Sequence, residues 1–252
     1  MVISGDGQKI RALSYNIHKG FSTGNLDFVL ERMKRSIENA QADIVFLQEV
    51  VGWHSEYSAK IESWPTVSQF EYIADRLWPH YAYGKNAVYS SGHHGNAILS
   101  KFPIGFYENQ DISSNNFEQR GILHATLDIG QRLHVLCVHL SLFEMHRREQ
   151  IDSLCERITT MVPKGDALLL GGDFNDWRER ASGILKQRLQ LEEVFLNNTG
   201  NHARTFPSWL PALKLDRIYY RGLSCESVNL LSGGEWSRLS DHLPILAEFC
   251  LK

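Results

Sequence analysis

The chain has 252 residues, 43% of them hydrophobic, and this content excludes an intrinsically disordered protein. Its formal net charge of −3 at pH 7 argues against tight non-specific binding to nucleic acid, which needs a basic surface. No apolar run approaches the ~18 residues of a transmembrane segment, and the start of the chain lacks the pattern of a signal peptide. We therefore expect one continuous domain over residues 1–252, located in the cytoplasm and without a transmembrane segment.

Hydrophobic periodicity predicts strands and helices that interleave along the chain. Short apolar runs indicate buried strands, whereas apolar residues at helical spacing indicate amphipathic helices, the first of them capped by Asn25. In chain order, the predicted elements are strand 10–17, helix 25–40, strand 43–50, helix 69–77, strands 97–100, 121–129 and 133–140, helix 145–162, strand 167–170, helix 183–191, and strands 215–220 and 243–250. A turn containing Gly130 joins two strands as a hairpin, so the pattern favours an α/β protein with mixed sheets covered by helices.

Two segments outside these elements, 51–68 and 105–118, are interpreted as surface loops that decide substrate specificity. Tryptophans also fall in or near predicted loops, at Trp53, Trp64, Trp209 and Trp236. A tryptophan in such a place can stack on a base, line a lipid groove or fill the edge of the core, and the sequence leaves these three roles open.

Polar side chains flank the ends of five predicted strands. They are Asn16, Glu49, His139, Asp173 with Asn175, and Asp241 with His242. One Asp or Asn at a strand end usually forms a turn or caps a helix, but recurrence at five ends favours a shared site. Mg²⁺ prefers oxygen ligands and is held by one or two carboxylates together with substrate oxygens, a role that suits Glu49 and Asp241. Zinc is the weaker prediction, because its usual His and Cys spacings are missing.

The same residue types supply what cleavage of a phosphoester requires. The reaction needs a deprotonated water, a clamp on the phosphorus oxygens and stabilisation of charge on the leaving group. The run Ser240-Asp241-His242 suggests a histidine that a carboxylate orients and makes more basic. The residues alone therefore predict a Mg²⁺-dependent phosphoester hydrolase.

These motifs together resemble the endonuclease/exonuclease/phosphatase superfamily, which includes pancreatic-type DNases, exonuclease III-type repair enzymes, inositol polyphosphate 5-phosphatases and neutral sphingomyelinases. The match runs in order through segments 14–17, 47–50, 95–100, 138–140, 172–175, 215–218 and 240–242. It implies a four-layer αββα sandwich with two central mixed β-sheets, and Mg²⁺ as the cofactor, with Mn²⁺ as an alternative.

The resemblance also implies roles for single residues. Glu49 would be the main Mg²⁺ ligand, with Asn16 and Asp241 completing or bracketing the metal site. His242, oriented by Asp216, would be the general base or a phosphate clamp. Three other roles are implied: Asp173 would position or deprotonate the attacking water, Asn175 would donate a hydrogen bond to a phosphoryl oxygen, and His139 would stabilise the scissile phosphate or the leaving oxygen. The base stays open between Asp173 and His242, and Asn96 is a candidate contact for the substrate phosphate.

Departures from the family pattern narrow the substrate. The Pro-Ala-Trp-Cys-Asp-Arg signature of inositol 5-phosphatases is missing, and residues 213–217 stand in its place. Repair endonucleases carry an acidic residue where this chain has His18, and a tyrosine where it has His139. Segments 95–100 and 204–207 resemble bacterial and sphingomyelinase-like branches. We therefore expect a phosphodiesterase that cleaves a lipid or small-molecule phosphodiester, without an obligate protein partner. A DNA endonuclease or exonuclease of the same fold is the alternative, and a non-catalytic binding module is disfavoured by the intact polar set.

Overall fold

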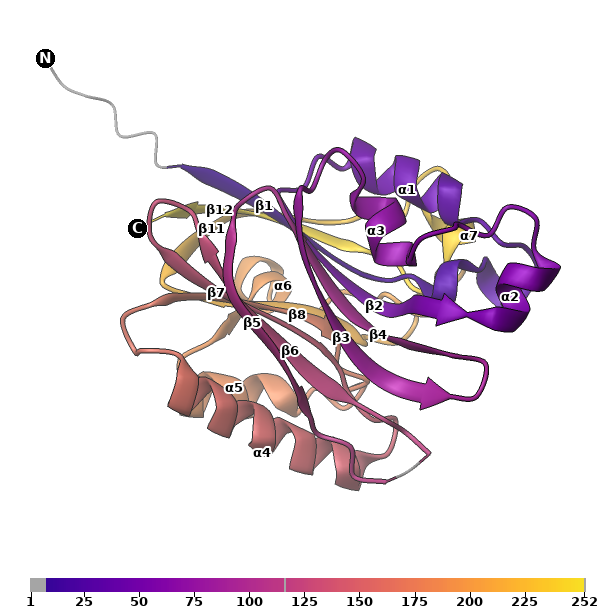
Figure 1. The fold of residues 1–252 in the computed structure, drawn as a ribbon. Helices are drawn as coiled ribbons and strands as arrows, with labels where there is room; N and C mark the ends of the chain where they lie inside the picture. Colours follow the sequence, from indigo (N-terminus) through magenta and orange to yellow (C-terminus); the bar gives the residue numbers. More distant parts are fainter. Residues whose placement is uncertain (1–7, 116, 252) are drawn as a thin grey trace, which may run out of the picture.

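Two β-sheets of six strands each are stacked face to face in the computed structural model, which describes residues 8–115 and 117–251 (Figure 1). The strands of the first sheet are β1 (Lys9–Asn16), β2 (Ile44–His54), β3 (His80–Tyr89), β4 (Gly92–Ser100), β11 (Leu223–Leu230) and β12 (Ile245–Leu251). Those of the second sheet are β5 (Ile104–Asp111), β6 (Gly121–Asp128), β7 (Arg132–His139), β8 (Ala167–Asp173), β9 (Glu192–Glu193) and β10 (Asp216–Arg221). Their spatial orders are β11-β12-β1-β2-β4-β3 and β5-β6-β7-β8-β10-β9. Both sheets are mixed, because β1 with β2 and β7 with β8 are parallel pairs among antiparallel neighbours.

Helices cover the outer face of each sheet (Figure 1). The first sheet is covered by α1 (Leu30–Asn39), α3 (Gln69–Ala74) and α7 (Trp236–Leu239), and the second by α4 (Glu144–Met161) and α5 (Ala181–Leu189). Two short helices, α2 (Ser55–Lys60) and α6 (Val194–Thr199), directly follow β2 and β9. Among the helices of the described residues, none combines the length and the apolar character needed to cross a lipid bilayer.

Apolar side chains fill three layers between these elements. Phe46, Leu169 and Phe249 meet between the two sheets, Met33 of α1 packs on the first sheet, and Leu154 of α4 packs on the second. All five side chains are fully buried, and burying a side chain of this size contributes roughly 1.5–3 kcal/mol to stability. The result is the four-layer αββα sandwich with two central mixed β-sheets, so the predicted fold is confirmed.

The first helix begins later than its sequence pattern predicts. α1 begins at Leu30, whereas Asn25 caps no helix and ends a 3₁₀ turn with a positive φ of 56°. The residues before the helix form a closed loop, because the backbone N–H of Ser22 donates to the carbonyl of Asp27 and the Ser22 hydroxyl accepts from the Asp27 N–H. These local bonds compete with the helix and delay its start.

The prediction of loops at 51–68 and 105–118 is wrong in part. β2 continues to His54 and α2 follows it, while β5 occupies the first half of the second segment. Sequence periodicity also missed β3 and β11, which lie at sheet edges as β5 does. Most side chains of these three strands are partly or fully exposed. An edge strand of this kind shows no clear alternation of apolar and polar residues, so a search for periodicity does not detect it.

The parallel strand pairs place polar residues at a common end of each sheet. In the first sheet, Asn16 at the end of β1 lies beside Gln48 of β2. In the second, His139 at the end of β7 lies beside Asp173 at the end of β8. Because parallel strands end at the same edge of a sheet, the chain delivers its strand-terminal side chains to one place in each sheet.

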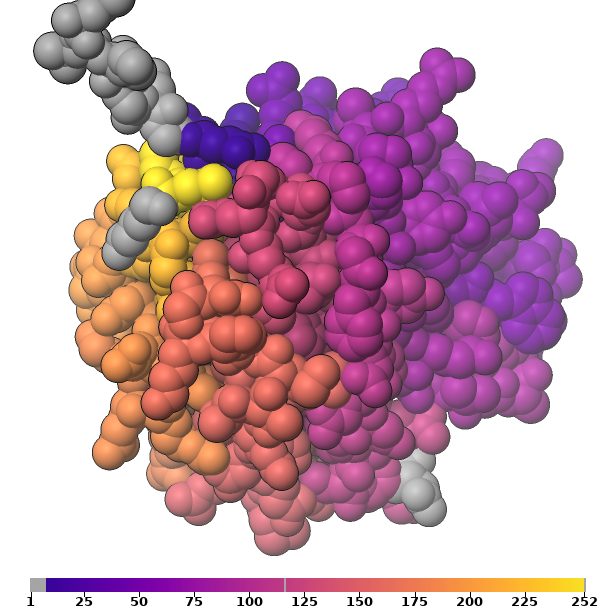
Figure 2. Space-filling model, turned by 60° about the vertical axis from the view of Figure 1, so that its left-hand side comes forward, coloured from indigo at the N-terminus to yellow at the C-terminus, as the bar shows by residue number. Residues whose placement is uncertain are grey.

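Antiparallel neighbours bring further polar residues to the same edge. β10 starts at Asp216, directly opposite Asp173, and residues 240–242 precede β12, which pairs with β1. At the other end of β1, Lys9 pairs with Cys250, and Figure 2 shows the beginning of the first strand beside the end of the last. The candidate site and the paired ends of the first and last strands therefore lie at opposite ends of β1.

Candidate active site

One imidazole lies between two buried carboxylates at this edge of the sandwich. Nδ1 of His242 lies 2.8 Å from Oδ2 of Asp216, and its Nε2 lies 3.7 Å from Oδ2 of Asp173. Burial alone would lower the pKa of His242, but the charges of the two carboxylates raise it to about 10. The imidazole is therefore a cation at neutral pH.

Several neighbouring groups converge on Asp173. Its carboxylate accepts hydrogen bonds from Asn16 Nδ2 at 3.1 Å and from the backbone N–H of Asn175 at 3.0 Å, and Nε2 of His139 lies 3.4 Å away. Burial raises the pKa of Asp173 to about 6, although His242 opposes this rise. Burial also holds the pKa of His139 well below its usual value, so this second imidazole is neutral. A carboxylate in this setting can accept a proton from water at neutral pH.

A second acidic region lies where β2 pairs irregularly with β4. Glu49 has a left-handed backbone with φ of 56°, which turns its side chain out of the regular strand. Nζ of Lys19 lies 3.5 Å from its Oε2, and Nδ1 of His18 lies 2.9 Å from Oδ1 of Asp241. Burial would raise the pKa of both carboxyl groups, but their cationic neighbours hold both values below the usual range. Both side chains are therefore ionised at neutral pH.

The donors in this region fit a hard divalent cation. The charge of Asp241 acts against ionisation of Glu49, so the two carboxylates repel one another, and a bound cation would relieve this repulsion. Asn16 adds an amide oxygen, which accepts the backbone N–H of His18 at 3.1 Å. The atoms of Asp173, Asp216 and His242, all within 4.8 Å of one another, also have metal-ligand chemistry. A metal bound there would first have to displace the proton of the His242 imidazolium.

A pocket of about 220 Å³ opens beside these groups and combines two kinds of lining. The polar lining residues are Glu49, Arg120, His139, Asp173, Asn175 and His242. The apolar lining residues are Leu142, Trp177, Phe206, Leu213 and Leu215. The structure thus brings five predicted residues to one pocket: Glu49, His139, Asp173, Asn175 and His242. Three others lie behind them, because Asn16 bonds to Asp173, Asp216 bonds to His242, and Asp241 bonds to Ser240.

Asn96 is the predicted residue that the structure places apart from this pocket. It is 1% exposed, and its Nδ2 donates to the backbone carbonyls of Gly121 at 3.2 Å and Cys137 at 3.3 Å. These bonds connect β4 of the first sheet with β6 and β7 of the second. The side-chain amide therefore braces the two sheets in this structure, and it lines no part of the pocket.

Two pocket residues, Arg120 and Trp177, were missed by the sequence reasoning. Arg120 pairs with Glu118 at 3.2 Å, and its Nε is buried without a hydrogen-bond partner in the described part of the chain. Trp177 lies under the guanidinium of Arg147, with 4.7 Å between the guanidinium carbon and the ring centroid. Arg120 directly precedes β6, whose antiparallel pairing with β7 puts it near the end of His139's strand. The pairing of β6 with β7 is therefore the feature from which Arg120 could have been predicted.

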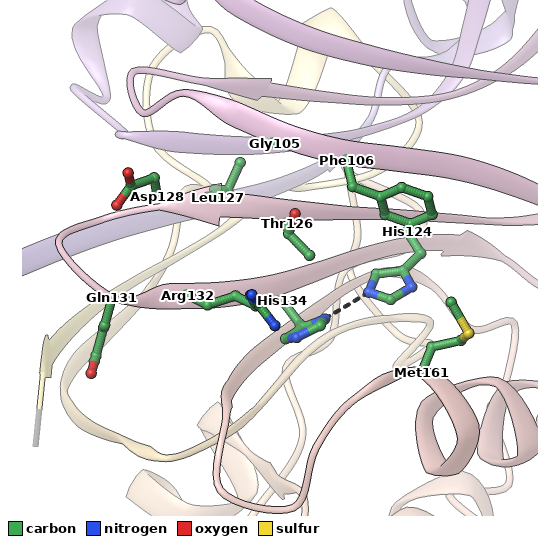
Figure 3. A pocket seen from close by; sticks show the side chains of 10 residues that line it. All are labelled: Gly105, Phe106, His124, Thr126, Leu127, Asp128, Gln131, Arg132, His134 and Met161. Carbon is green, nitrogen blue, oxygen red and sulfur yellow. Dashed lines mark hydrogen bonds between the residues drawn. The ribbon is translucent and has the colours of Figure 1, made fainter.

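A larger hollow, of about 620 Å³, lies elsewhere on the outer face of the second sheet. Figure 3 shows Phe106, His124 and His134 on neighbouring strands, with Met161 at the end of α4. His124 Nε2 lies 2.9 Å from His134 Nδ1, and His134 Nε2 lies 3.2 Å from Asp166 Oδ2. The two imidazoles are thus already hydrogen-bonded to protein groups, and this hollow shares no lining residue with the candidate pocket described above.

Comparisons with known sequences identify relatives of this chain. Residues 13–242 match the Endonuclease/Exonuclease/phosphatase family. The chain is 44% identical over 244 residues to the uncharacterized protein YbhP of Escherichia coli K12, covering 96% of each chain. A UPF0294 protein of Vibrio parahaemolyticus is 31% identical over 128 residues, which are 50% of this chain and 42% of that protein.

Solved structures show the same fold at low sequence identity. An endonuclease/exonuclease/phosphatase from Beutenbergia cavernae superposes with a TM-score of 0.78 at 17% identity, over 97% of this chain and 72% of that one. D. rerio TDP2 complexed with single strand DNA product gives a TM-score of 0.70 at 18% identity, over 96% and 99% of the two chains. Enzymes of the matched family hydrolyse phosphoester bonds, and this chain belongs to the endonuclease/exonuclease/phosphatase family.

Proposed function

We propose that the protein is a Mg²⁺-dependent phosphodiesterase that cleaves a lipid or small-molecule phosphodiester by in-line attack of an activated water. The observation that supports this proposal is the mixed lining of the pocket, where the catalytic polar groups share one small space with Trp177, Leu213 and Leu215. A phosphodiester with an apolar substituent matches both kinds of lining, because its charge faces the polar groups while its substituent leaves water.

The metal would be held by Glu49 and Asp241, with the amide oxygen of Asn16 as a third protein donor. When bound, the cation supplies positive charge to the phosphoryl oxygens and so lowers the barrier to attack. Lys19, 3.5 Å from Glu49, would keep that carboxylate ionised and ready to bind. Mn²⁺ also accepts oxygen ligands and is expected to substitute for Mg²⁺.

Asp173 is the better candidate for the general base. His242 keeps its proton between Asp216 and Asp173, so it has no free site for a proton from water. Asp173 is ionised at neutral pH, yet its raised pKa of about 6 makes it more basic than an ordinary aspartate. In this proposal Asp173 deprotonates the water, and His242 donates a hydrogen bond to a phosphoryl oxygen.

Three further groups would contact the phosphate. Asn175 donates one N–H of its side-chain amide to the carbonyl of Leu140 at 2.9 Å, which leaves its second N–H for a phosphoryl oxygen. The neutral imidazole of His139 would stabilise the scissile phosphate or the leaving oxygen. Arg120, with its unpaired Nε, would offset negative charge that develops on the pentacovalent phosphorus.

Hydrolysis of DNA is the second candidate. The observation that favours it is the likeness of the fold to TDP2, whose solved structure holds a single strand DNA product. This function requires a basic groove beside the pocket and strong dependence of binding on salt. The net charge of −3 and the apolar pocket residues favour the lipid or small-molecule diester over DNA.

One panel of substrates tests the proposal. Purified protein with Mg²⁺ would be assayed on bis-(p-nitrophenyl) phosphate, p-nitrophenyl phosphate, sphingomyelin, phosphatidylglycerol, plasmid DNA and a single-stranded oligonucleotide. We expect turnover of the small diester and of one phospholipid, dependence on Mg²⁺, and loss of turnover in His242→Ala. Turnover of DNA alone would replace the proposal by the second candidate, and no turnover of any diester would refute both.

A further inference from the structure

Exposed apolar side chains gather on three loops around the catalytic pocket. Leu26 is 82% exposed in the loop before α1, and Trp209 and Leu210 are 65% and 63% exposed before β10. Phe143 is 62% exposed at the end of the loop after β7, and Met145 is 67% exposed in the first turn of α4, which follows this loop. The loop after β7 lines the pocket through Leu142, and the loop before β10 lines it through Phe206 and Leu213. Soluble proteins rarely expose such a group of large apolar side chains unless it contacts a partner.

Hydrogen bonds at the base of each loop hold these apolar tips in place. Leu213 donates its N–H to the carbonyl of Phe206 at 2.8 Å, which closes a hairpin with Trp209 and Leu210 at its tip. Ser208 Oγ and Thr23 Oγ1 both donate to the carbonyl of Ser240, at 2.6 Å and 2.9 Å. The hairpin and the loop of Leu26 are therefore anchored side by side on the segment that carries the site residues Asp241 and His242.

The third loop is held from inside the protein. Arg147 is 2% exposed and donates to the carbonyls of Ser141 and Leu142 at 3.0 Å, and the N–H of Leu142 donates to Glu118. The exposure of Phe143 thus results from a fixed backbone, and the apolar tip needs little reordering before it contacts a partner. A preformed surface loses less conformational entropy on binding.

The same rim carries excess positive charge beside Trp177. Arg178 and Arg180, both about half exposed, form ion pairs with the single carboxylate of Glu144, and Arg147 lies 4.0 Å from it. The two exposed guanidinium groups of Arg178 and Arg180 therefore share one carboxylate, whereas Arg147 is buried and is also stabilised by the charge of Asp176. Phosphate headgroups of a lipid surface would complement these cations, while the acyl region would receive the apolar tips.

Resting on the proposed function, we propose that these three loops form an interfacial surface that docks on a phospholipid bilayer and presents the headgroup phosphodiester to the catalytic pocket. Tryptophan suits the tip of the hairpin, because its ring is apolar while its N–H bonds to the polar boundary of the bilayer. Apolar side chains continue from the pocket to the exposed loop tips around it. This continuity favours a lipid over a protein partner, because a lipid would be both the substrate in the pocket and part of the bilayer that the tips contact.

Sedimentation with vesicles of phosphatidylcholine and phosphatidylglycerol tests this surface. We expect the parent protein to bind, and Trp209→Ser with Leu210→Ser to weaken vesicle binding and vesicle hydrolysis by about tenfold or more, since two apolar side chains lose their burial. Turnover of soluble bis-(p-nitrophenyl) phosphate should not change in this variant. The matched control is Tyr107→Ser, which removes a 55% exposed side chain on the edge strand β5 and should alter none of these readouts.

Lipids brominated on their acyl chains give a second readout, because they quench only tryptophans that reach the hydrocarbon. Quenching should be present in the parent protein and reduced in Trp209→Phe, which retains vesicle binding. Equal vesicle binding by the parent and the double-serine variant would overturn the inference, as would protection of Trp209 by an oligonucleotide instead of vesicles. A parent protein that hydrolyses the soluble diester but does not bind vesicles refutes only the docking surface, whereas a parent without any diester turnover refutes the proposed function.

Discussion

His242 and Asp216 form a hydrogen-bonded pair in which Nδ1 lies 2.8 Å from Oδ2, and the carboxylate is fully buried. Oδ1 of Asp216 has no hydrogen-bond partner within the described residues. A buried carboxylate with one free oxygen is costly unless a nearby cation compensates its charge. The His242 imidazolium supplies this compensation, so the carboxylate fixes both the orientation and the protonation state of the ring.

Asp216→Asn should therefore lower turnover without unfolding the protein. Asparagine keeps the shape but removes the charge, so the pKa of His242 should fall and its ring should lose the fixed tautomer. We expect kcat to drop by roughly 10²–10⁴-fold, as for other buried carboxylates that orient a catalytic histidine. Kinetics would be paired with NMR titration of His242. An unchanged imidazole titration would contradict the role given to Asp216.

Asp173→Asn tests the choice of base. The amide retains the size of the carboxylate and can still accept one hydrogen bond, but it cannot take a proton from water. Turnover should fall by roughly 10²–10⁴-fold while the circular dichroism spectrum and the midpoint of urea unfolding stay close to those of the parent. If the Asp173→Asn variant retains its activity, Asp173 is not the general base, and His242 becomes the candidate.

Glu49→Gln tests the metal site. The substitution removes one of the two carboxylates proposed to hold the cation, so the Mg²⁺ concentration for half-maximal activity should rise by roughly tenfold to hundredfold. Calorimetric titration of Mg²⁺ in the absence of substrate provides an independent measurement. Glu38→Gln, on the outer surface of α1, is a suitable control. A Mg²⁺ titration identical to that of the parent would exclude Glu49 as a ligand.

Sequence patterns predicted the central strands and the strand-end residues because both have strong local signals. Buried strands such as β2 and β8 begin with continuous apolar runs, and Asp173 is the last residue of β8. The edge strands β3, β5 and β11 lack this signal because solvent reaches much of their surface. Arg120 was missed although the hairpin of β6 and β7 was predicted, because its place in the pocket depends on the register of that pairing.

Asn96 shows that a sequence motif does not predict the direction of a side chain. The motif places an asparagine near the site, but the direction of its side chain depends on how the two sheets stack. In the structure Nδ2 bonds to carbonyls of the second sheet, and the residue lies among buried groups. Motif position alone therefore could not separate a contact with substrate from a brace between sheets.

Arg120→Gln should weaken catalysis while preserving the fold. The substitution removes a pocket cation, so kcat/KM should fall by roughly tenfold to hundredfold, the effect of losing one charge-assisted hydrogen bond to phosphate. The pKa of His139 should also rise, because Arg120 contributes to its depression. Arg76→Gln on the outer surface is a control for loss of positive charge. Equal kcat/KM in parent and Arg120→Gln would remove Arg120 from the list of substrate contacts.

The buried pair of His124 and His134 should make stability fall in mild acid. Burial lowers the pKa of His124 to about 4 and also lowers the pKa of His134, whereas both groups titrate near their ordinary value in the unfolded chain. Between about pH 6.5 and pH 4 the unfolded state therefore binds more protons than the folded state. The contribution of this pair to the free energy of unfolding should be fully present above this window and should decrease as the pH falls through it.

His124→Gln isolates this contribution. Glutamine can replace the hydrogen bond to His134 but does not titrate, so the loss of stability between pH 7 and pH 5 should be smaller in the variant by about 1 kcal/mol or more. Urea unfolding at a series of pH values measures the difference directly. His80→Gln, which removes a histidine from the edge strand β3, serves as the matched control. If the parent and His124→Gln lose stability equally on acidification, protons are not taken up by this pair, and the acid sensitivity must come from other groups.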